Sequence, residues 1–318
     1  MKAAFVFPGQ GSQSVGMMRS LLHLPRVRET FDEASAALSL DLWNLVENGP
    51  ENKLNETVNT QPVMLCAGVA MYRAWESMGG RRPFLLAGHS LGEYSALVAG
   101  NAIMFDDAVR LVQFRAQAMQ EAVPEGVGAI AAIVGLEDDV VRAVCLEASS
   151  GQEIVEAANY NSPAQTVIAG HKAAVDRGME LAKQKGAKRA ILLPMSVPSH
   201  CALMRAAAER LKMRLSEIPL EVASISVVHN ADVSISTSAS AIKESLFRQL
   251  FQPVRWVEVV RTLATMGATH IVECGPGRVL AGLNKRIVPD VKMLTFADAV
   301  NFDEALAMLA REKDQEHA

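Results

Sequence analysis

The chain of 318 residues has no apolar run near the roughly 20 residues that a membrane-spanning helix needs, so no membrane partner is expected. It also has no block of like charges and no low-complexity tract, which is typical of a globular protein. Its 31 Lys and Arg residues stand against 35 Asp and Glu residues, which gives a net charge of −4. This balance argues against nucleic acid as the main partner.

Cysteine is also scarce, and its spacing excludes two kinds of site. The four cysteines are Cys66, Cys145, Cys201 and Cys274, and no two of them form a CxxC pair. Isolated thiols are typical of cytoplasmic proteins, so a cytoplasmic location is expected. No cluster of His, Cys and carboxylate residues has the spacing of metal ligands, so the sequence predicts neither a metal nor a bound cofactor.

The most informative segment is the pentapeptide Gly-His-Ser-Leu-Gly at residues 88–92. A short apolar run precedes it, and an amphipathic, helix-like stretch follows it. Strand, Gly-x-Ser-x-Gly turn and helix in this order predict a nucleophile elbow, a turn so tight that only small residues fit on either side of the serine. The amide of Leu91 would then point to where an oxyanion forms. Ser90 is therefore predicted to be the nucleophile of an acyl enzyme.

The rest of the chain alternates between β-rich runs and helical patterns, which is typical of an α/β fold with a largely parallel sheet. The N-terminal run reaches Pro8 and Gly9 too early for a signal peptide, so it is expected to be the first strand. Expected strands cover residues 3–7, 84–87, 224–228 and 270–273. Expected helices cover residues 27–38, 61–78, 105–122, 204–217, 242–249 and 256–266. The large domain is therefore expected to be α/β-hydrolase-like.

The middle third has a different rhythm. Strands are expected at 128–134, 154–159, 165–169 and 189–193, and helices at 137–148 and 173–185. This β-α-β-β-α-β order is the ferredoxin-like arrangement. We therefore predict a small domain at residues 125–196 inserted into a large domain made of residues 1–124 and 197–318. A crevice between two domains is the expected place for a ligand.

An elbow serine needs a general base, and seven histidines compete for that role. His200 is the best candidate, because it lies in a Pro-containing loop where the chain returns from the small domain. His89 adjoins the nucleophile but should point to the opposite face. His229, in an expected loop, stays open as an alternative. The remaining four lie in less suitable settings: His23, His171, His270 and His317.

A hydrolase of this fold would place an acidic residue between the serine and the histidine in sequence, at a strand end. The acids between Ser90 and His200 instead fall in expected helices or in the small domain. The base is therefore expected to be oriented by a neutral group, such as a backbone carbonyl.

Seven motifs together resemble the malonyl-CoA:acyl carrier protein transacylase family of bacterial fatty-acid synthesis, from residue 4 to about residue 300. They are FPGQGSQ (7–13), GHSLGE (88–93), Arg115 with MQEAVPEG (119–126), NYNSP (159–163), PSH (198–200), Gln249 with PV (253–254) and GPG (275–277). The resemblance implies transfer of a malonyl group from malonyl-CoA to the carrier's phosphopantetheine thiol, with no bound cofactor.

The resemblance also implies a role for each matching position. Ser90 would carry the acyl group, His200 would be the base, and the backbone carbonyl of Gln249 would orient it. The amides of Gln10 and Leu91 would form the oxyanion hole. Substrate contacts would come from Arg115, Gln10 and Asn159, with the planar fork of Arg115 gripping the malonyl carboxylate.

An acidic carrier calls for a basic docking surface, for which Lys285 and Arg286 resemble the family's residues. A second basic cluster consists of Lys183, Lys185, Lys188 and Arg189. One departure from the family occurs at His229-Asn230, where its members more often have Asn-Asn. A monomer is expected. The alternatives are a serine ester or thioester hydrolase, a malonyltransferase of a polyketide or malonate decarboxylase system, and a non-catalytic carrier-binding module.

Overall fold

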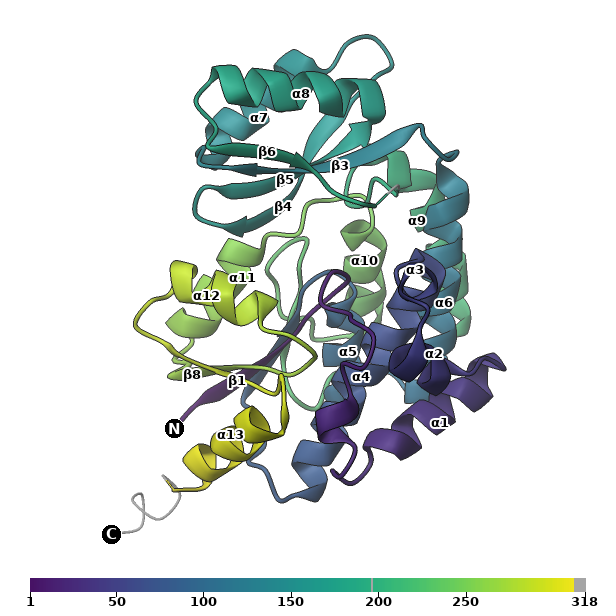
Figure 1. Cartoon of the computed structure of the whole chain (residues 1–318), viewed down its shortest axis with the longest axis vertical. Helices are drawn as coiled ribbons and strands as arrows, with labels where there is room; N and C mark the ends of the chain where they lie inside the picture. The colour runs from purple at the N-terminus through teal and green to yellow at the C-terminus, as the bar shows by residue number, and fades with distance from the viewer. Residues whose placement is uncertain (196, 312–318) are drawn as a thin grey trace.

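The computed structural model describes residues 1–195 and 197–311 and contains two sheets, one above the other in Figure 1. The lower sheet has five parallel strands in the order β7-β2-β1-β8-β9. These strands are β1 (Ala3–Phe7), β2 (Leu85–Gly88), β7 (Val227–Val228), β8 (His270–Glu273) and β9 (Lys292–Thr295).

The central strand β1 shows why this sheet is covered on both faces. All five of its residues are buried. Ala3, Phe5 and Phe7 belong to one hydrophobic core, and Ala4 and Val6 belong to another. Successive side chains of a strand point to opposite faces, so this continuous apolar run requires helices on both sides.

Helices provide both layers, and Figure 1 shows α11 and α12 on one side of β1 with α4 and α5 on the other. The smaller core is closed by α11 (Trp256–Thr265) and α12 (Val279–Ile287). The larger core draws on α1 (Val27–Leu38), α2 (Leu42–Asn48), α3 (Glu51–Leu54), α4 (Thr57–Ser77), α5 (Gly92–Ala99), α6 (Phe105–Ala122), α9 (Arg205–Glu217), α10 (Ala239–Gln249) and α13 (Ala299–Arg311). Single 3₁₀ turns lie at Arg19–Leu21 and Ala202–Met204.

The upper sheet in Figure 1 has four antiparallel strands in the order β4-β5-β3-β6. The strands are β3 (Gly128–Val134), β4 (Val155–Ser162), β5 (Gln165–His171) and β6 (Arg189–Leu192), and α7 (Asp138–Ala148) and α8 (Lys172–Gln184) cover one face. Chain order and strand order are those of a ferredoxin-like fold. The prediction of a large α/β domain with a ferredoxin-like small domain is confirmed; the exact boundaries, 1–124 and 197–318 against 125–196, stay a prediction.

The small domain is connected to the large domain through the edge strand β4. The amide of Tyr160 donates to the carbonyl of Val254, and the amide of Val254 donates to the carbonyl of Ala158, both at 2.9 Å. The face of the small sheet that carries no helix includes Ile130 and Val167, which turn toward the large domain and line a cavity there. The small domain therefore forms a roof over that cavity.

Several elements differ from the sequence-based prediction. Helices α2, α3, α12 and α13 and strand β9 were not expected, α10 begins at Ala239 instead of residue 242, and β4 ends at Ser162 instead of residue 159. Helix α4 begins at Thr57 instead of residue 61, because the amide of Thr60 already donates to the carbonyl of Glu56 at 2.8 Å, and Pro62 lies inside the helix. Strand β7 is only two residues long, since the amide of Ser224 donates to the carbonyl of Gly100 in a loop instead of joining the sheet.

Candidate active site

The turn between β2 and α5 has the geometry of a nucleophile elbow. Ser90 has a φ of 51°, in the left-handed region that residues with a side chain avoid. A Cβ added to Gly88 would overlap the backbone of Gly92, and a Cβ added to Gly92 would overlap the carbonyl of Phe7. Both glycines are thus required by space, and the turn holds the Ser90 hydroxyl at the carboxyl end of β2.

His200 reaches Ser90 from the loop that follows the small domain. Its Nε2 lies 2.7 Å from Ser90 Oγ, and its Nδ1 lies 2.7 Å from the carbonyl oxygen of Gln249. A carbonyl only accepts, so Nδ1 carries the proton and Nε2 has a lone pair free to accept from the serine hydroxyl. His200 also has a positive φ, 63°.

The surroundings of His200 keep its ring neutral. Burial lowers the pKa of His200 to about 3, and the positive charge of Arg115 acts in the same direction, against the hydrogen bond to the Gln249 carbonyl. The ring is therefore an unprotonated base across the physiological pH range. The neutral orienter expected from the sequence lies where an Asp would stand in a Ser-His-Asp triad.

Arg115 extends from α6 into the same site and is almost fully buried. Its Nη1 donates to Gln61 Oε1 at 2.7 Å, and its Nη2 donates to Gln249 Oε1 at 3.1 Å and to Ser90 Oγ at 3.4 Å. Among the described residues no carboxylate forms a salt bridge with it. Burial lowers the pKa of Arg115. A buried cation with only neutral partners is prepared to receive an anion.

The loop after β1 lies against the elbow. A Cβ on Gly9 would come within 2.6 Å of the carbonyl oxygen of His89, so this close approach requires glycine. It brings Gln10 to the same cavity as Leu91. Within the described residues, the backbone amides of Gln10 and Leu91 donate to no protein acceptor, so both are available for an oxygen atom of a substrate.

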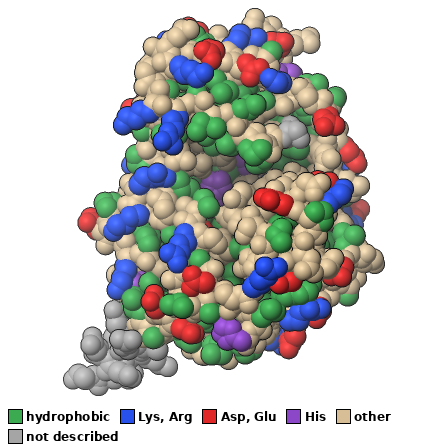
Figure 2. Space-filling model, in the orientation of Figure 1, with side chains coloured by type: hydrophobic (Ala, Val, Ile, Leu, Met, Phe, Trp, Pro, Cys, Tyr) green, Lys and Arg blue, Asp and Glu red, His purple; other side chains and the backbone are tan. Residues whose placement is uncertain are grey.

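Around these groups lies a cavity of about 150 Å³ between the two domains. Figure 2 shows the hollow between the upper and lower parts of the molecule, with histidine colour inside it. Asn159 of β4 lines the cavity, as do Ile130 and Val167. The residues that sequence analysis proposed for catalysis and substrate binding, with the exception of the buried Gln249, all line it: Gln10, Ser90, Leu91, Arg115, Asn159 and His200.

The other histidines occupy different settings. His89 lines the cavity, but its Nε2 lies 2.8 Å from Asn161 Oδ1 and its ring packs on Trp256. The alternative base, His229, is buried against the carboxylate of Glu93. His23 is exposed, His171 Nδ1 accepts from a small-domain amide, and His270 lies beside Thr269; His317 lies outside the described residues.

Sequence analysis named Gln249, His229 and Asn230 for other reasons but did not connect them with Glu93 in a buried polar cluster behind the elbow. Glu93 of α5 contacts His229, Asn230 and Gln249, and all four side chains are almost completely inaccessible to solvent. The available signal was a carboxylate at the start of a helical stretch that is otherwise apolar.

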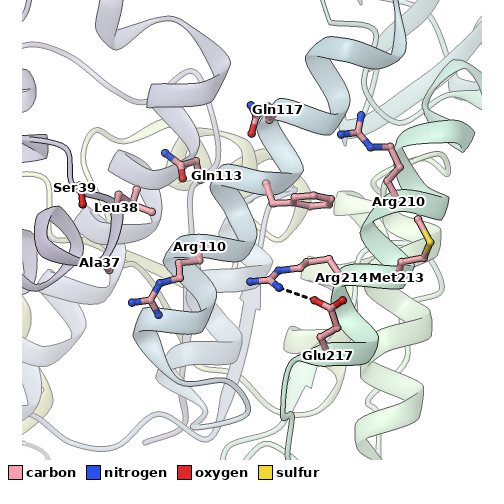
Figure 3. A pocket seen from close by; sticks show the side chains of 11 residues that line it. Ala37, Leu38, Ser39, Arg110, Gln113, Gln117, Arg210, Met213, Arg214 and Glu217 are labelled. Atoms are coloured by element: carbon pink, nitrogen blue, oxygen red, sulfur yellow. Dashed lines mark hydrogen bonds and ion pairs between the residues drawn. The ribbon is translucent and has the colours of Figure 1, made fainter.

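A larger hollow of about 680 Å³ lies elsewhere, among α1, α6 and α9, and shares no lining residue with the catalytic cavity. Figure 3 shows three arginines around it, from α6 and α9. Each arginine lies beside a carboxylate: Arg110 with Asp106 at 3.6 Å, Arg210 with Glu121 at 2.7 Å and Arg214 with Glu217 at 2.6 Å. Their charges are already compensated, so the hollow has no evident preference for an anion.

The proposed docking residues lie in the last turn of α12. Lys285 Nζ donates to the carbonyl of Pro289 at 2.6 Å, and Arg286 Nη2 donates to Gln165 Oε1 of the small domain at 2.8 Å. Both side chains are exposed. Figure 2 shows Lys and Arg side chains gathered on the side of the molecule where Figure 1 places α12.

In the second basic cluster, two lysines have carboxylate partners. Lys183 pairs with Glu180 at 2.7 Å and Lys185 with Glu147 at 3.1 Å.

Over the ranges 1–195 and 197–311, no group of three or more His, Cys, Asp or Glu side chains is arranged to hold a metal ion. Within that same part of the chain, no helix has both the length and the apolar character to cross a membrane.

Comparison with known proteins places this site in a family. The acyl transferase domain model matches residues 4–308. The malonyl CoA-acyl carrier protein transacylase of Escherichia coli K12 is 53% identical over 96% of this chain and 97% of its own length. The crystal structure of the acyl-carrier-protein S-malonyltransferase of Burkholderia pseudomallei superposes with a TM-score of 0.94 at 55% identity, covering 96% of this chain and 100% of that one.

A third relative is a malonyl-transacylase whose structure was solved in complex with a type II PKS acyl-carrier protein. It superposes with a TM-score of 0.95 at 49% identity, over 96% of this chain and 99% of that one. The resemblance seen in the motifs is thus confirmed over nearly the whole chain, and this protein belongs to the acyl transferase family, among the malonyl CoA-acyl carrier protein transacylases.

Proposed function

We propose that this enzyme transfers the malonyl group of malonyl-CoA to the phosphopantetheine thiol of an acyl carrier protein, through a malonyl-Ser90 intermediate. The observation that carries the proposal is the position of Arg115, whose Nη2 lies 3.4 Å from the nucleophilic oxygen in a buried site. A serine hydrolase of neutral esters has no use for a buried guanidinium there. An acyl group that ends in a carboxylate, in contrast, needs a cation such as this guanidinium to bind it.

In the first half-reaction Ser90 Oγ attacks the thioester carbonyl carbon while its proton passes to His200 Nε2. The carbonyl oxygen becomes an oxyanion, which the amides of Gln10 and Leu91 stabilise by about 3 kcal/mol per donor. The intermediate collapses by breaking the C–S bond, and His200 returns the proton to the departing sulfur. The products are malonyl-Ser90 and free CoA thiol.

The second half-reaction reverses these steps with a different thiol. His200 takes the proton of the phosphopantetheine thiol, the thiolate sulfur attacks the malonyl-Ser90 carbonyl, and the same two amides hold the oxyanion. Breaking the C–Oγ bond releases malonyl carrier protein, and the proton returns to Ser90. The Gln249 carbonyl keeps the imidazole in the tautomer that both steps require.

Throughout both steps Arg115 would hold the malonyl carboxylate by two parallel charge-assisted hydrogen bonds. Gln10 and Asn159, from opposite sides of the cavity, would contact the rest of the acyl and pantetheine chain. This division of roles separates chemistry at Ser90 from selection at Arg115.

For the carrier, we propose docking beside α12 at Lys285 and Arg286, which are exposed basic residues suited to an acidic partner. The pathway we propose is fatty-acid synthesis, and the working form is a monomer in the cytoplasm. The monomeric state rests on the sequence analysis alone, and the cytoplasmic location is supported by the four cysteines, which are free, buried thiols.

Intact-protein mass spectrometry after mixing with malonyl-CoA tests the proposed function. The wild type should gain one malonyl group, and Ser90→Ala should gain none. Ser95→Ala is a matched control, because Ser95 is a buried serine of α5, the helix that follows the elbow, and belongs to no part of the proposed mechanism. Release of CoA without an adduct would instead indicate a hydrolase, and neither adduct nor release would indicate a binding module.

A further inference from the structure

A buried carboxylate lies directly behind the elbow, and the reaction steps above do not use it. Glu93 is the second residue of α5 and is completely buried. Its Oε1 lies 2.7 Å from His229 Nδ1, and its Oε2 accepts from the amide of Asn230 at 3.1 Å and from Gln249 Nε2 at 3.0 Å. A carboxylate is kept in a protein interior only where hydrogen bonds replace its water, and here two segments, His229-Asn230 and Gln249, supply three of them.

The contact with Gln249 has consequences for both halves of the site. Gln249 Nε2 also donates to the carbonyl of Ser90 at 2.8 Å, while its Oε1 accepts from Arg115. Its backbone carbonyl is the group that orients His200. A carboxylate and a carbonyl only accept, so Glu93 and the Ser90 carbonyl together hold the NH₂ of this amide, and its oxygen faces Arg115, which only donates.

The contact with Asn230 acts on the elbow. Asn230 Oδ1 accepts from the backbone amide of Ser90, and its Nδ2 donates to the carbonyl of Gly88, each at 2.7 Å. These two bonds hold the turn at the left-handed conformation of Ser90. Glu93 in turn fixes the backbone of Asn230 through its amide.

The arrangement also places a negative charge near Arg115 without direct contact between the two charged groups. Arg115, Gln249 and Glu93 form a line in which a single amide separates the cation from the carboxylate. A carboxylate in direct contact with Arg115 would compete with the malonyl carboxylate for the same fork. Placing it behind Gln249 compensates the buried charge and leaves the guanidinium open to the substrate.

We propose that Glu93, held by His229, is a positioning residue: its three hydrogen bonds set the orientation of Gln249 and Asn230, and through them the positions of His200, Arg115 and Ser90. This inference rests on the proposed function for its kinetic test. It also makes a purely structural prediction, which does not depend on the reaction.

The structural prediction concerns the tautomer of His229. In the wild type Nδ1 must carry the proton, because it faces a carboxylate. In Glu93→Gln the new amide must turn its oxygen toward the two donors, Asn230 N and Gln249 Nε2. Its NH₂ then faces His229, which can accept only in the other tautomer. ¹⁵N NMR of the ring nitrogens should therefore show a switch from Nδ1–H to Nε2–H.

The kinetic test is the single-turnover rate constant for acylation of Ser90, measured with malonyl-CoA and acetyl-CoA. This rate constant is independent of how much of the preparation is folded, so a merely structural role would lower the amplitude and leave the rate constant unchanged. Glu93→Leu removes all three acceptor contacts and should slow both acylations at least tenfold. Glu93→Gln, which keeps all three, should stay within about threefold of wild type.

His229 supplies a second pair of variants if Glu93→Leu fails to fold. His229→Asn places an amide nitrogen near the position of Nδ1 and should retain activity, whereas His229→Leu leaves Glu93 Oε1 unpaired and should slow acylation. Wild-type rate constants in Glu93→Leu or His229→Leu would overturn the proposal, as would an unchanged tautomer in Glu93→Gln. If wild-type Ser90 is not malonylated at all, the proposed function fails, and the tautomer measurement alone decides the inference.

Discussion

Replacing Arg115 with alanine should convert a selective enzyme into an unselective one. The change removes the guanidinium that lies 3.4 Å from Ser90 Oγ and leaves the Ser90–His200 pair in place. Truncating one partner of a buried, hydrogen-bonded charge pair costs about 2 to 5 kcal/mol. At 1.4 kcal/mol per factor of ten, kcat/KM for malonyl-CoA should fall by roughly 30-fold to 4,000-fold.

Acetyl-CoA has no carboxylate, so its kcat/KM should change by less than about tenfold. The loss of a positive charge removes one of the causes that lower the pKa of His200, of which burial is the largest, and it does not impair the base. The assay is the initial rate of CoA release with each thioester in the presence of carrier protein. The measured quantity is the ratio of the two kcat/KM values.

Two further variants make the result interpretable. Arg115→Lys keeps the charge but loses the planar fork, and should give an intermediate ratio. Arg110→Ala is the matched control, since Arg110 lies on the same helix and lines the separate hollow of Figure 3. Equal losses with malonyl-CoA and acetyl-CoA in Arg115→Ala would refute the reasoning, because Arg115 would then support the site instead of selecting the substrate.

Three more predictions concern the elbow, the base and the carrier. Gly92→Ala should lower the melting temperature by several degrees or prevent folding, because its Cβ would overlap the carbonyl of Phe7. Thermal unfolding measures this change, and an unchanged melting temperature would show that the turn accommodates a side chain at this position. Burial and a neighbouring guanidinium lower the pKa of His200 to about 3, so the ring gains a proton only at a pH far below the ordinary pKa of a histidine. The acylation rate should therefore stay flat from about pH 8 to about pH 5, and an acidic limb centred near pH 6.5 would contradict this. Lys285→Glu with Arg286→Glu should raise the KM for the carrier and leave Ser90 malonylation unchanged, which steady-state assays at varied carrier concentration can test; an unchanged carrier KM would move docking elsewhere.

The parts of the fold that could be predicted from the sequence are those in which the residues of one short segment determine its local structure. The apolar run at Ala3–Phe7 can be buried only inside a covered sheet. The elbow has both glycines at the positions where a side chain would collide with backbone. The ferredoxin-like domain followed from the order of its elements, because few arrangements accommodate that order.

What sequence could not predict depends on pairing between distant segments. Strand β9 at Lys292–Thr295 has no fully buried residue and is held in the sheet by β8 on one side. Glu93 is separated from His229 by 136 positions and from Gln249 by 156, so no local spacing connects them. Each is unremarkable alone, and only the fold makes them one cluster.

The same limit explains how the base was identified. Spacing alone left both His200 and His229 open, and the family resemblance favoured His200. In the structure His200 Nε2 faces Ser90 Oγ, while His229 faces a carboxylate behind the elbow. The deciding quantity was the direction of each ring, which a linear sequence does not contain.

Both residues that would exchange the proton, Ser90 and His200, have positive φ angles of 51° and 63°. A backbone in this region costs each of them about 1 to 3 kcal/mol relative to a relaxed conformation. Glycine would relieve that cost at either position and would abolish the chemistry. Selection for thermal stability alone would therefore replace Ser90 and His200 early, whether in the laboratory or in a lineage that no longer needs the activity. The result would be a well-folded protein without a nucleophile or a base.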